Sequence, residues 1–426
     1  MKDWELLYNS RICSVQEAIK CIQPYQNLFL AAYCSEPQTV VEELVRQRER
    51  LKGTTLNVNV AGSPLLYAQE ESLPYFRIRT SLSSPGLKKA MRTGDCDYVP
   101  MNLSEIPKFI RESEVDVALI QVSPPNKEGY CNLGISVEAI HSLVEKAKFV
   151  IAEMNEQMPI TYGETWISVN QIDCFVPSSR PLLTIPEGKL SSVEKKIGEN
   201  VASLIPDGAT IQWGIGNIPN SVLYSLMDKK DLGVHSGSIT DPVIDLIDSG
   251  VITNRKKTVK PNKMVCTLLL GTEKLNQYVD NNPMFELHPV EFTHSGAIIS
   301  QIDNFHSINS ALEVDLAGQV NAESINNHTI AGVGGQMDFI RGAQYSKGGK
   351  AIIAFPSTTK DGTKSRIKAT VEKVTSVKSE VQFIVTEYGV ARLFGKSLKE
   401  RAQELISIAH PDFREELMYK WKNNVF

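Results

Sequence analysis

A chain of 426 residues, 42% of them hydrophobic, is long enough to bury a full core and suggests at least two domains. Its formal net charge of −4 is small, and no lysine- and arginine-rich stripe with interleaved aromatic residues occurs, which argues against nucleic-acid binding. The N-terminus has no apolar signal region, and no run of about 18 apolar residues is present. We therefore expect a soluble, cytoplasmic protein with no membrane partner.

The seven cysteines are scattered, with no CxxC pair and an odd total. This pattern is typical of reduced thiols in the cytosol rather than of a disulfide framework or a zinc site. We expect no metal centre.

Predicted strands and helices alternate through the first half of the chain. Helices are expected over residues 14–22, behind a serine cap, and over 38–52 and 136–147, where apolar residues recur at helical spacing. Strands are expected over residues 27–32, 54–61, 95–101, 116–122 and 148–154. Such alternation predicts a mostly parallel sheet covered on both faces.

A proline- and serine-rich stretch between Pro177 and Gly188 marks the expected boundary between two domains, residues 1–185 and 186–426. The same alternation then resumes. Helices are expected over residues 191–204, 220–229, 242–249, 397–409 and 411–423, and strands over 210–213, 264–270, 350–355 and 381–385. We therefore expect two similar α/β domains. Ligands of such sheets bind at the carboxyl ends of the strands.

The stretch Val234-His235-Ser236-Gly237-Ser238-Ile239-Thr240-Asp241 reads as a strand, a turn and a helix cap. Gly237 permits a positive φ in the turn. Thr240 or Asp241 is expected to cap the following helix, with Pro242 at its first position.

Three other turns that follow strands are candidate ligand-binding sites. Gly214-Ile215-Gly216-Asn217-Ile218-Pro219 opens a helix, so its backbone N–H groups can face an anion or an oxyanion, although close strand–helix packing would explain it equally. The glycine-rich segment at residues 332–339 is either a ligand-facing turn or a bulged hairpin, and it is not a P-loop. The loop with Lys360, Lys364 and Arg366 suits a solvated surface, phosphates or a carboxylate.

Conventional catalytic groups are sparse. His235 neighbours Ser236, but adjacent strand residues point to opposite faces, so a Ser-His-Asp triad is not supported. Three further histidines are not spaced as metal ligands and are interpreted as core or surface residues: His288, His294 and His306. Glu36, which follows a strand, reads on its own as a surface carboxylate.

Several long segments together carry a resemblance that runs nearly end to end. They are Ser35-Glu36-Pro37, Asp97-Tyr98-Val99-Pro100, Val122-Ser123-Pro124-Pro125 with Gly129-Tyr130-Cys131, Asn155 with Met158-Pro159, residues 214–219, residues 308–320, residues 334–339 and residues 385–391. With these segments the chain resembles the family I coenzyme A transferases, in the acetyl-CoA hydrolase/transferase group that includes 4-hydroxybutyrate and butyrate CoA-transferases.

The resemblance implies two similar, open, mostly parallel α/β domains with the active site between them, and a homodimer or larger homo-oligomer. It implies CoA transfer from an acyl-CoA to a carboxylate through a glutamyl-CoA thioester, with CoA as substrate and no cofactor or metal. Oriented N–H groups would stabilise the developing oxyanion. The residues that it assigns to CoA and acyl contacts are Gly214, Ile215, Gly216, Asn217, Ile218, Asn309, Gly334, Gly335 and Lys360.

The chain departs from the family pattern at the nucleophile. Aligned on His235, Ser236 and Asp241, the family glutamate falls on Gly237, which has no side chain. The first interpretation is a CoA-transferase in which the acceptor acid, including a dicarboxylic acid such as succinate or itaconate, attacks directly. A replacement carboxylate is the variant of this interpretation, with Glu36 as its first candidate.

Two other interpretations stay open. An acyl-CoA hydrolase would use water in the space at Gly237, with His235 or Glu36 as general base. A protein that binds acyl-CoA without turnover would need neither.

Overall fold

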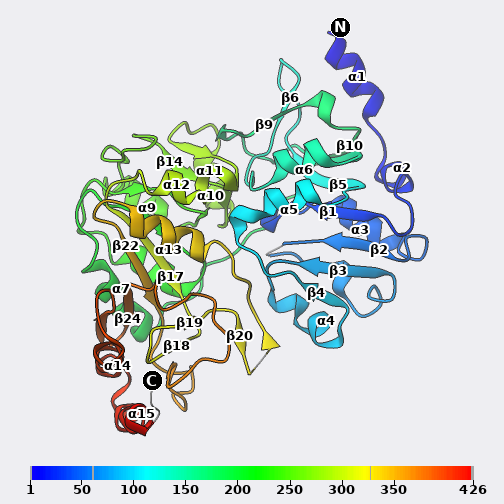
Figure 1. Ribbon diagram of the computed structural model, residues 1–426. Helices are drawn as coiled ribbons and strands as arrows, with labels where there is room; N and C mark the ends of the chain where they lie inside the picture. The colour runs from blue at the N-terminus through cyan, green and yellow to red at the C-terminus, as the bar shows by residue number, and fades with distance from the viewer. Residues whose placement is uncertain (1, 60–61, 327, 424–426) are drawn as a thin grey trace. The chain divides into compact units, whose positions relative to one another are not determined.

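A computed structural model describes residues 2–59, 62–326 and 328–423 (Figure 1). The chain divides into two compact units. The first comprises Met1–Pro186 and Val265–Phe292, and the second comprises Glu187–Met264 and Thr293–Phe426. The chain thus leaves the first unit at Pro186 and returns to it once. The domain limits expected from the sequence, residues 1–185 and 186–426, assigned residues 265–292 to the second domain instead.

The first unit is built on a seven-stranded sheet in the order β10-β7-β5-β1-β2-β3-β4, in which every neighbouring pair is parallel. Its strands are β1 (Asn27–Leu30), β2 (Thr54–Asn57), β3 (Phe76–Thr80), β4 (Cys96–Tyr98), β5 (Val117–Val122), β7 (Phe149–Asn155) and β10 (Cys174–Ser178). The interior strand β5 is buried along its whole length, as a strand covered on both faces should be. Residues 60–61, the end of one expected strand, lie outside the described residues.

The second unit has a six-stranded sheet in the order β12-β11-β17-β22-β24-β25. Its strands are β11 (Thr210–Trp213), β12 (Gly233–Val234), β17 (Phe305–Ser310), β22 (Lys350–Ala354), β24 (Phe383–Thr386) and β25 (Gly389–Arg392). Only the β24–β25 pair is antiparallel. Both units therefore confirm the expected α/β class with mostly parallel sheets.

The remaining strands are short. They are β6 (Tyr130–Asn132), β8 (Tyr162–Gly163), β9 (Trp166–Ser168), β13 (Ser238–Ile239), β14 (Met264–Cys266), β15 (Leu268–Leu269), β16 (Phe285–Leu287), β18 (Glu313–Asp315), β19 (Val320–Asn321), β20 (Ser324–Ile325), β21 (His328–Thr329) and β23 (Ile367–Lys368).

The helices of the first unit are α1 (Asp3–Arg11), α2 (Val15–Lys20), α3 (Gln38–Arg46), α4 (Lys88–Thr93), α5 (Ile106–Glu112), α6 (Ile140–Lys146) and α10 (Glu273–Val279). A short helix, α11 (Val290–Thr293), lies where the chain passes to the second unit. The helices of the second unit are α7 (Ser192–Ala202), α8 (Asn217–Tyr224), α9 (Val243–Asp248), α12 (Gly296–Ile299), α13 (Gln336–Tyr345), α14 (Leu398–Ser407) and α15 (Pro411–Asn423).

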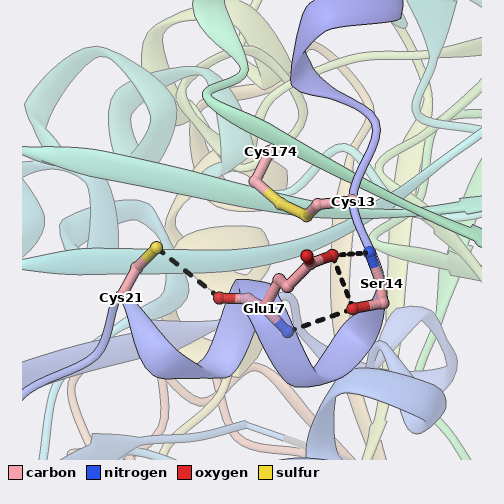
Figure 2. The surroundings of a disulfide bond; sticks show 5 residues. All are labelled: Cys13, Ser14, Glu17, Cys21 and Cys174. Carbon is pink, nitrogen blue, oxygen red and sulfur yellow. Dashed lines mark hydrogen bonds between the residues drawn. A yellow bond between two sulfur atoms is a disulfide. The ribbon is translucent and has the colours of Figure 1, made fainter.

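Hydrogen bonds determine where two of the helices of the first unit begin. The serine cap expected before α2 is confirmed, because Ser14 Oγ accepts a hydrogen bond from Glu17 N–H and the Glu17 carboxylate accepts one from Ser14 N–H (Figure 2). The helix expected from residue 136 begins only at Ile140. The N–H groups of Val137 and Val290 bond to Thr267 O and Glu138 O, which holds the preceding turn in a non-helical form.

Cys13 and Cys174 form a disulfide bond (Figure 2), so the expectation of reduced thiols is wrong for this pair. The segment before α2 runs beside the edge strand β10, where Cys13 N–H donates to Phe175 O at 3.0 Å. This pairing brings the two Cα atoms to 6.5 Å, within the range that a disulfide spans. The other five cysteines, all within the described residues, form no disulfide bond.

No helix in the described part of the chain is both long and apolar enough to cross a membrane. Among residues 2–59, 62–326 and 328–423, no group of three or more histidine, cysteine or acidic side chains is arranged to hold a metal ion.

Candidate functional site

Several of the residues expected to form the site follow neighbouring parallel strands of the second unit. Strands β12, β11, β17 and β22 lie side by side in that sheet, and Gly237, Gly214, Asn309 and Lys360 lie at or beyond their carboxyl ends. Because the carboxyl ends of parallel strands meet at one edge, these residues share the edge at which open α/β sheets bind ligands.

The glycine turn after β11 leads directly into helix α8. Gly214 N–H donates to Ile308 O at 3.0 Å, which ties the turn to β17. Gly216 has a φ of +121°, a conformation that requires glycine, and no other atom lies within 4 Å of where a Cβ on it would stand. The N–H groups of the first turn of α8 lack partners within the helix, so the space beside Gly216 suits an anion.

Asn309 lies beside this turn. Its side-chain amide exchanges two hydrogen bonds of 3.3 Å with the amide of Gln212. A Cβ on Gly214 would lie 3.7 Å from Asn309 Oδ1, an ordinary contact distance. The reciprocal pair fixes the orientation of the Asn309 amide at the sheet edge.

Lys360 and Asn217, which the sequence places far apart, share a carboxylate neighbour. Burial alone would raise the pKa of Glu194, but hydrogen bonds from Ser191 and Asn217 and the nearby charge of Lys360 lower it. Lys360 is exposed and therefore available to a ligand. Lys360 thus carries its positive charge near the Glu194 carboxylate, which also bonds to Asn217 at the start of α8.

Gly237 is half-buried, and its backbone is not in the left-handed region that the turn suggested. A side chain is therefore not excluded here by backbone strain. The limit is space, because a Cβ on Gly237 would lie 3.0 Å from His294 Nε2 and 3.5 Å from the Phe339 ring. The imidazole of His294 fills the volume next to the missing side chain.

Gly335 contacts the same imidazole. A Cβ there would come within 2.5 Å of His294 Cδ2, so both Gly237 and Gly335 leave room for one ring. Gly335 precedes the first residue of α13, and Gly334 has a φ of +60°. The hairpin interpretation of this glycine segment is therefore wrong, because the segment opens a helix.

His294 is held tightly in its place. It is 1% exposed, its Nδ1 lies 2.9 Å from Thr293 Oγ1, and its ring lies 4.6 Å from that of Phe339. Burial lowers the pKa of His294 to about 3, so the imidazole is neutral at physiological pH. Sequence reasoning interpreted His294 only as a core or surface residue, because no local spacing signal connects it to Gly237.

The polar side chains near Gly237 form hydrogen bonds with other parts of the second unit. His235 is buried with Nε2 3.0 Å from Thr293 O, and Ser236 Oγ donates to Trp213 O. Thr240 Oγ1 donates to Asn220 Oδ1 and accepts from the Trp213 indole. Helix α9 starts at Val243, so its N-cap position is Pro242 rather than Thr240 or Asp241 as expected.

Glu36 lies in the first unit, after β1, and is completely buried. Its carboxylate accepts hydrogen bonds from Tyr67 at 2.9 Å, from Gln38 at 2.5 Å and from Ser63. Burial raises the pKa of Glu36, and these three hydrogen bonds oppose the shift. Its role as a replacement nucleophile stays a prediction.

Models of one protein family match residues in both units. The N-terminal domain of the acetyl-CoA hydrolase/transferase family matches residues 2–184, and the C-terminal domain of that family matches residues 271–421. The chain is 46% identical to the 4-hydroxybutyrate coenzyme A transferase of Clostridium kluyveri, over 99% of each chain. It is 37% identical to the succinyl-CoA:cyclohexane-1-carboxylate CoA transferase of Geobacter metallireducens, over 98% of this chain and 96% of that one.

A solved structure has the same fold. The 4-hydroxybutyrate CoA-transferase of Porphyromonas gingivalis superposes with a TM-score of 0.86 and 37% identity, over 99% of each chain. The matches cover both units. The chain belongs to the acetyl-CoA hydrolase/transferase family.

Proposed function

We propose that the protein is a CoA-transferase that moves CoA between a short acyl-CoA and a small carboxylic acid, dicarboxylic acids included. The observation that carries the proposal is the identity to CoA-transferases over essentially the whole chain, at 46% and 37%. The open anion site before α8 and the nearby Lys360 support it, because CoA brings phosphates and the reaction develops an oxyanion.

The reaction proceeds without a nucleophile at position 237. A carboxylate oxygen of the acceptor attacks the thioester carbonyl carbon, the C–S bond breaks, and CoA leaves as a thiolate. The products of this step are a mixed anhydride and the thiolate. The thiolate then attacks the acceptor carbonyl of the anhydride, which forms the new thioester and releases the donor acid as a carboxylate.

The residues of the sheet edge act by binding and orientation. Backbone N–H groups at Gly216, Asn217 and Ile218 stabilise charge on the thioester oxygen, and Lys360 binds a phosphate of CoA. The ring of His294 is neutral, so it has no net charge that would attract or repel an acceptor carboxylate that approaches Gly237.

Hydrolysis and acyl-CoA binding without turnover are the competing functions. Each of these two functions predicts products that differ from those of CoA transfer when the same donor and acceptor are mixed. A hydrolase releases CoA without any acceptor, and a binding protein consumes no donor.

A panel of acyl-CoA donors and carboxylate acceptors tests the proposal, with products separated by chromatography. The expected result is acceptor-dependent exchange of CoA, with little CoA released when no acceptor is present. Intact-mass measurement after acyl-CoA alone should find no bound CoA. A hydroxylamine-sensitive CoA adduct would instead support a replacement glutamate such as Glu36, and exchange by none of the pairs would overturn the proposal.

We propose that the enzyme works in the cytoplasm as a homo-oligomer, as similar enzymes commonly do. Light scattering on the purified protein measures its mass in solution, and a value equal to one 47.3 kDa chain would contradict the oligomer.

A further inference from the structure

The imidazole of His294 has one ring nitrogen without a hydrogen-bond partner. Its Nδ1 lies 2.9 Å from Thr293 Oγ1. Within residues 2–59, 62–326 and 328–423, no group forms a hydrogen bond with its Nε2. The side chain is 1% exposed, and polar groups on side chains so deeply buried are normally hydrogen-bonded. The Nε2 atom is therefore a candidate contact for a ligand.

Gly237 and Gly335 leave the Nε2 edge of this ring uncovered. A Cβ on Gly237 would lie 3.0 Å from Nε2 and 3.1 Å from Cε1, and a Cβ on Gly335 would lie 2.6 Å from Nε2 and 2.5 Å from Cδ2. Neither glycine has a positive φ, so the backbone would accept another residue at both positions. Both glycines are half-buried, and a ligand can therefore reach Nε2 between them.

The charge of the ring suits a carboxylate that has to react. His294 and the two glycines belong to the second unit, together with the glycine turn before α8 at which the resemblance places CoA. Burial lowers the pKa of His294 to about 3, so the ring donates a hydrogen bond without forming an ion pair. A positively charged donor would hold a carboxylate more firmly and make it a weaker nucleophile. A neutral donor orients the carboxylate and leaves its negative charge available for attack.

The hydroxyl group of Thr293 allows the ring proton of His294 to lie on Nε2. A hydroxyl group can accept a hydrogen bond from Nδ1–H or donate one to a bare Nδ1, and the distance of 2.9 Å suits both. A carboxylate only accepts hydrogen bonds, so its arrival favours the form in which Thr293 donates and Nε2 carries the proton. The ring can therefore present an N–H group to an acid without gaining charge.

We propose that Nε2 of His294 donates a hydrogen bond to the carboxylate of the acceptor acid and holds it beside Gly237 for direct attack on the thioester. This role rests on the CoA transfer proposed above. One carboxylate oxygen accepts from Nε2, and the other attacks the thioester carbonyl carbon as the C–S bond breaks and CoA leaves as a thiolate. The imidazole keeps its proton throughout. The acceptor thus supplies the carboxylate at the place where the resemblance puts the family glutamate.

Two amide variants of His294 separate the hydrogen bond from the packing of the ring. Glutamine carries its amide nitrogen about as far along the side chain as Nε2, whereas asparagine carries its amide near Nδ1 and has nothing at Nε2. With the best donor and acceptor of the panel above, His294→Asn should lower kcat/KM for the acid about 10- to 100-fold and keep KM for acyl-CoA within about two-fold. His294→Gln should recover most of the loss. A glutamine variant no better than the asparagine variant, or equal losses for both substrates, would overturn the proposal.

A single added methyl group tests access to Nε2. Gly237→Ala places its Cβ 3.0 Å from Nε2, so we expect kcat/KM for the acid to fall about 10-fold with KM for acyl-CoA nearly unchanged. Gly296→Ala is the matched control, since no other atom lies within 4 Å of a Cβ there. An unchanged Gly237→Ala enzyme would contradict the site. Release of CoA without acceptor that is fast in the wild type and lost in His294→Asn would show that Nε2 holds water instead of an acid.

Binding measured without turnover distinguishes failure of this site from failure of the proposed function. Acetate, added in the presence of CoA to protein labelled with carbon-13 in its histidine rings, should shift one ring signal in the NMR spectrum, and His294→Asn should lack that signal. Sodium chloride at the same ionic strength is the control and should not shift it. If the wild type transfers CoA to no acid, the transferase assignment fails, and a shift of this signal still supports the carboxylate site. No shift overturns the site, whether or not CoA is transferred.

Discussion

A Cβ atom on Gly237 would lie 3.0 Å from Nε2 of His294, and the two residues therefore share one volume at the edge of the second sheet. A side chain at position 237 and the imidazole of His294 cannot both fit there unless one of them moves. A carboxylate introduced at position 237 must displace the ring by a few tenths of an ångström or more, and the packing of His294 against Phe339 and Thr293 resists this.

Restoring a glutamate should create covalent chemistry only when space is made for it. We expect Gly237→Glu/His294→Ala to form a glutamyl-CoA adduct on incubation with acyl-CoA, and Gly237→Glu alone to form less, because the ring crowds its side chain. Intact-mass measurement with and without hydroxylamine detects the adduct. Gly296→Glu is the control, since no other atom lies within 4 Å of a Cβ there. An adduct in neither Gly237 variant, with both folded, would count against the alignment of Gly237 with the family nucleophile.

The sequence allowed the regular elements and the edge residues to be predicted, because local signals encode them. Strand β11 and helix α15 have the expected bounds, and Ser14 caps α2 as its spacing with Glu17 indicates. The glycine turn at residues 214–219 was recognisable because it lies between a strand and a helix. Such features depend on neighbours within a few positions.

Features built from remote segments could not be predicted in this way. His294 reaches Gly237 and Gly335 only after the chain has folded. The turn that carries Glu138 looked like the start of a helix, but hydrogen bonds from remote segments hold it in another form. The partner of Cys13 is 161 positions away, and no local spacing signal connects the two cysteines.

Glu138 should make stability depend on pH. Burial raises its pKa in the folded state from the usual 4.5 to about 7, so the folded state binds this proton more tightly than the unfolded state. The resulting penalty is absent below about pH 4.5, grows as the pH rises to 7 and is complete above it. Glu138→Gln should therefore raise the free energy of unfolding at pH 8 by on the order of 1 to 3 kcal/mol, and by much less at pH 5. Urea unfolding at both pH values measures this, and an equal gain at both would contradict the assignment.

Glu36 should prove more important for stability than for covalent chemistry. Glu36→Gln places an amide donor among the hydroxyl and amide donors of Ser63, Tyr67 and Gln38, and we expect a loss of about 1 to 3 kcal/mol in unfolding free energy. We expect kcat/KM of the folded variant to stay within about 10-fold of wild type, since a lost nucleophile costs far more. Loss of all transfer in a folded Glu36→Gln protein, together with a CoA adduct in the wild type, would identify Glu36 as the nucleophile.

The Cys13–Cys174 disulfide should stabilise the first unit, because it lowers the conformational entropy of the unfolded chain. A disulfide typically contributes about 2 to 4 kcal/mol, and the loss of chain entropy for a loop this long gives about 5 kcal/mol. Cys13→Ser should lower Tm in the absence of reductant, and adding reductant should lower the wild-type Tm towards the same value. Cys21→Ser, at an exposed free thiol, is the control and should leave Tm unchanged. Alkylation and intact mass of the untreated protein count the free thiols, and seven modified cysteines would contradict the bond.

Lys360 should contribute to CoA binding through its charge. We expect Lys360→Ala to raise KM for acyl-CoA about 10-fold with kcat nearly unchanged, because a phosphate contact remote from the thioester binds substrate and transition state alike. The effect should shrink as salt rises from about 0.05 to 0.5 M, since screening weakens an exposed ion pair. Lys364→Ala, at an exposed lysine of the same loop that the resemblance does not assign to CoA, is the matched control. Equal changes in the two variants would show a general effect of the charge of the loop, and a fall in kcat with unchanged KM in Lys360→Ala would place Lys360 at the reacting group instead.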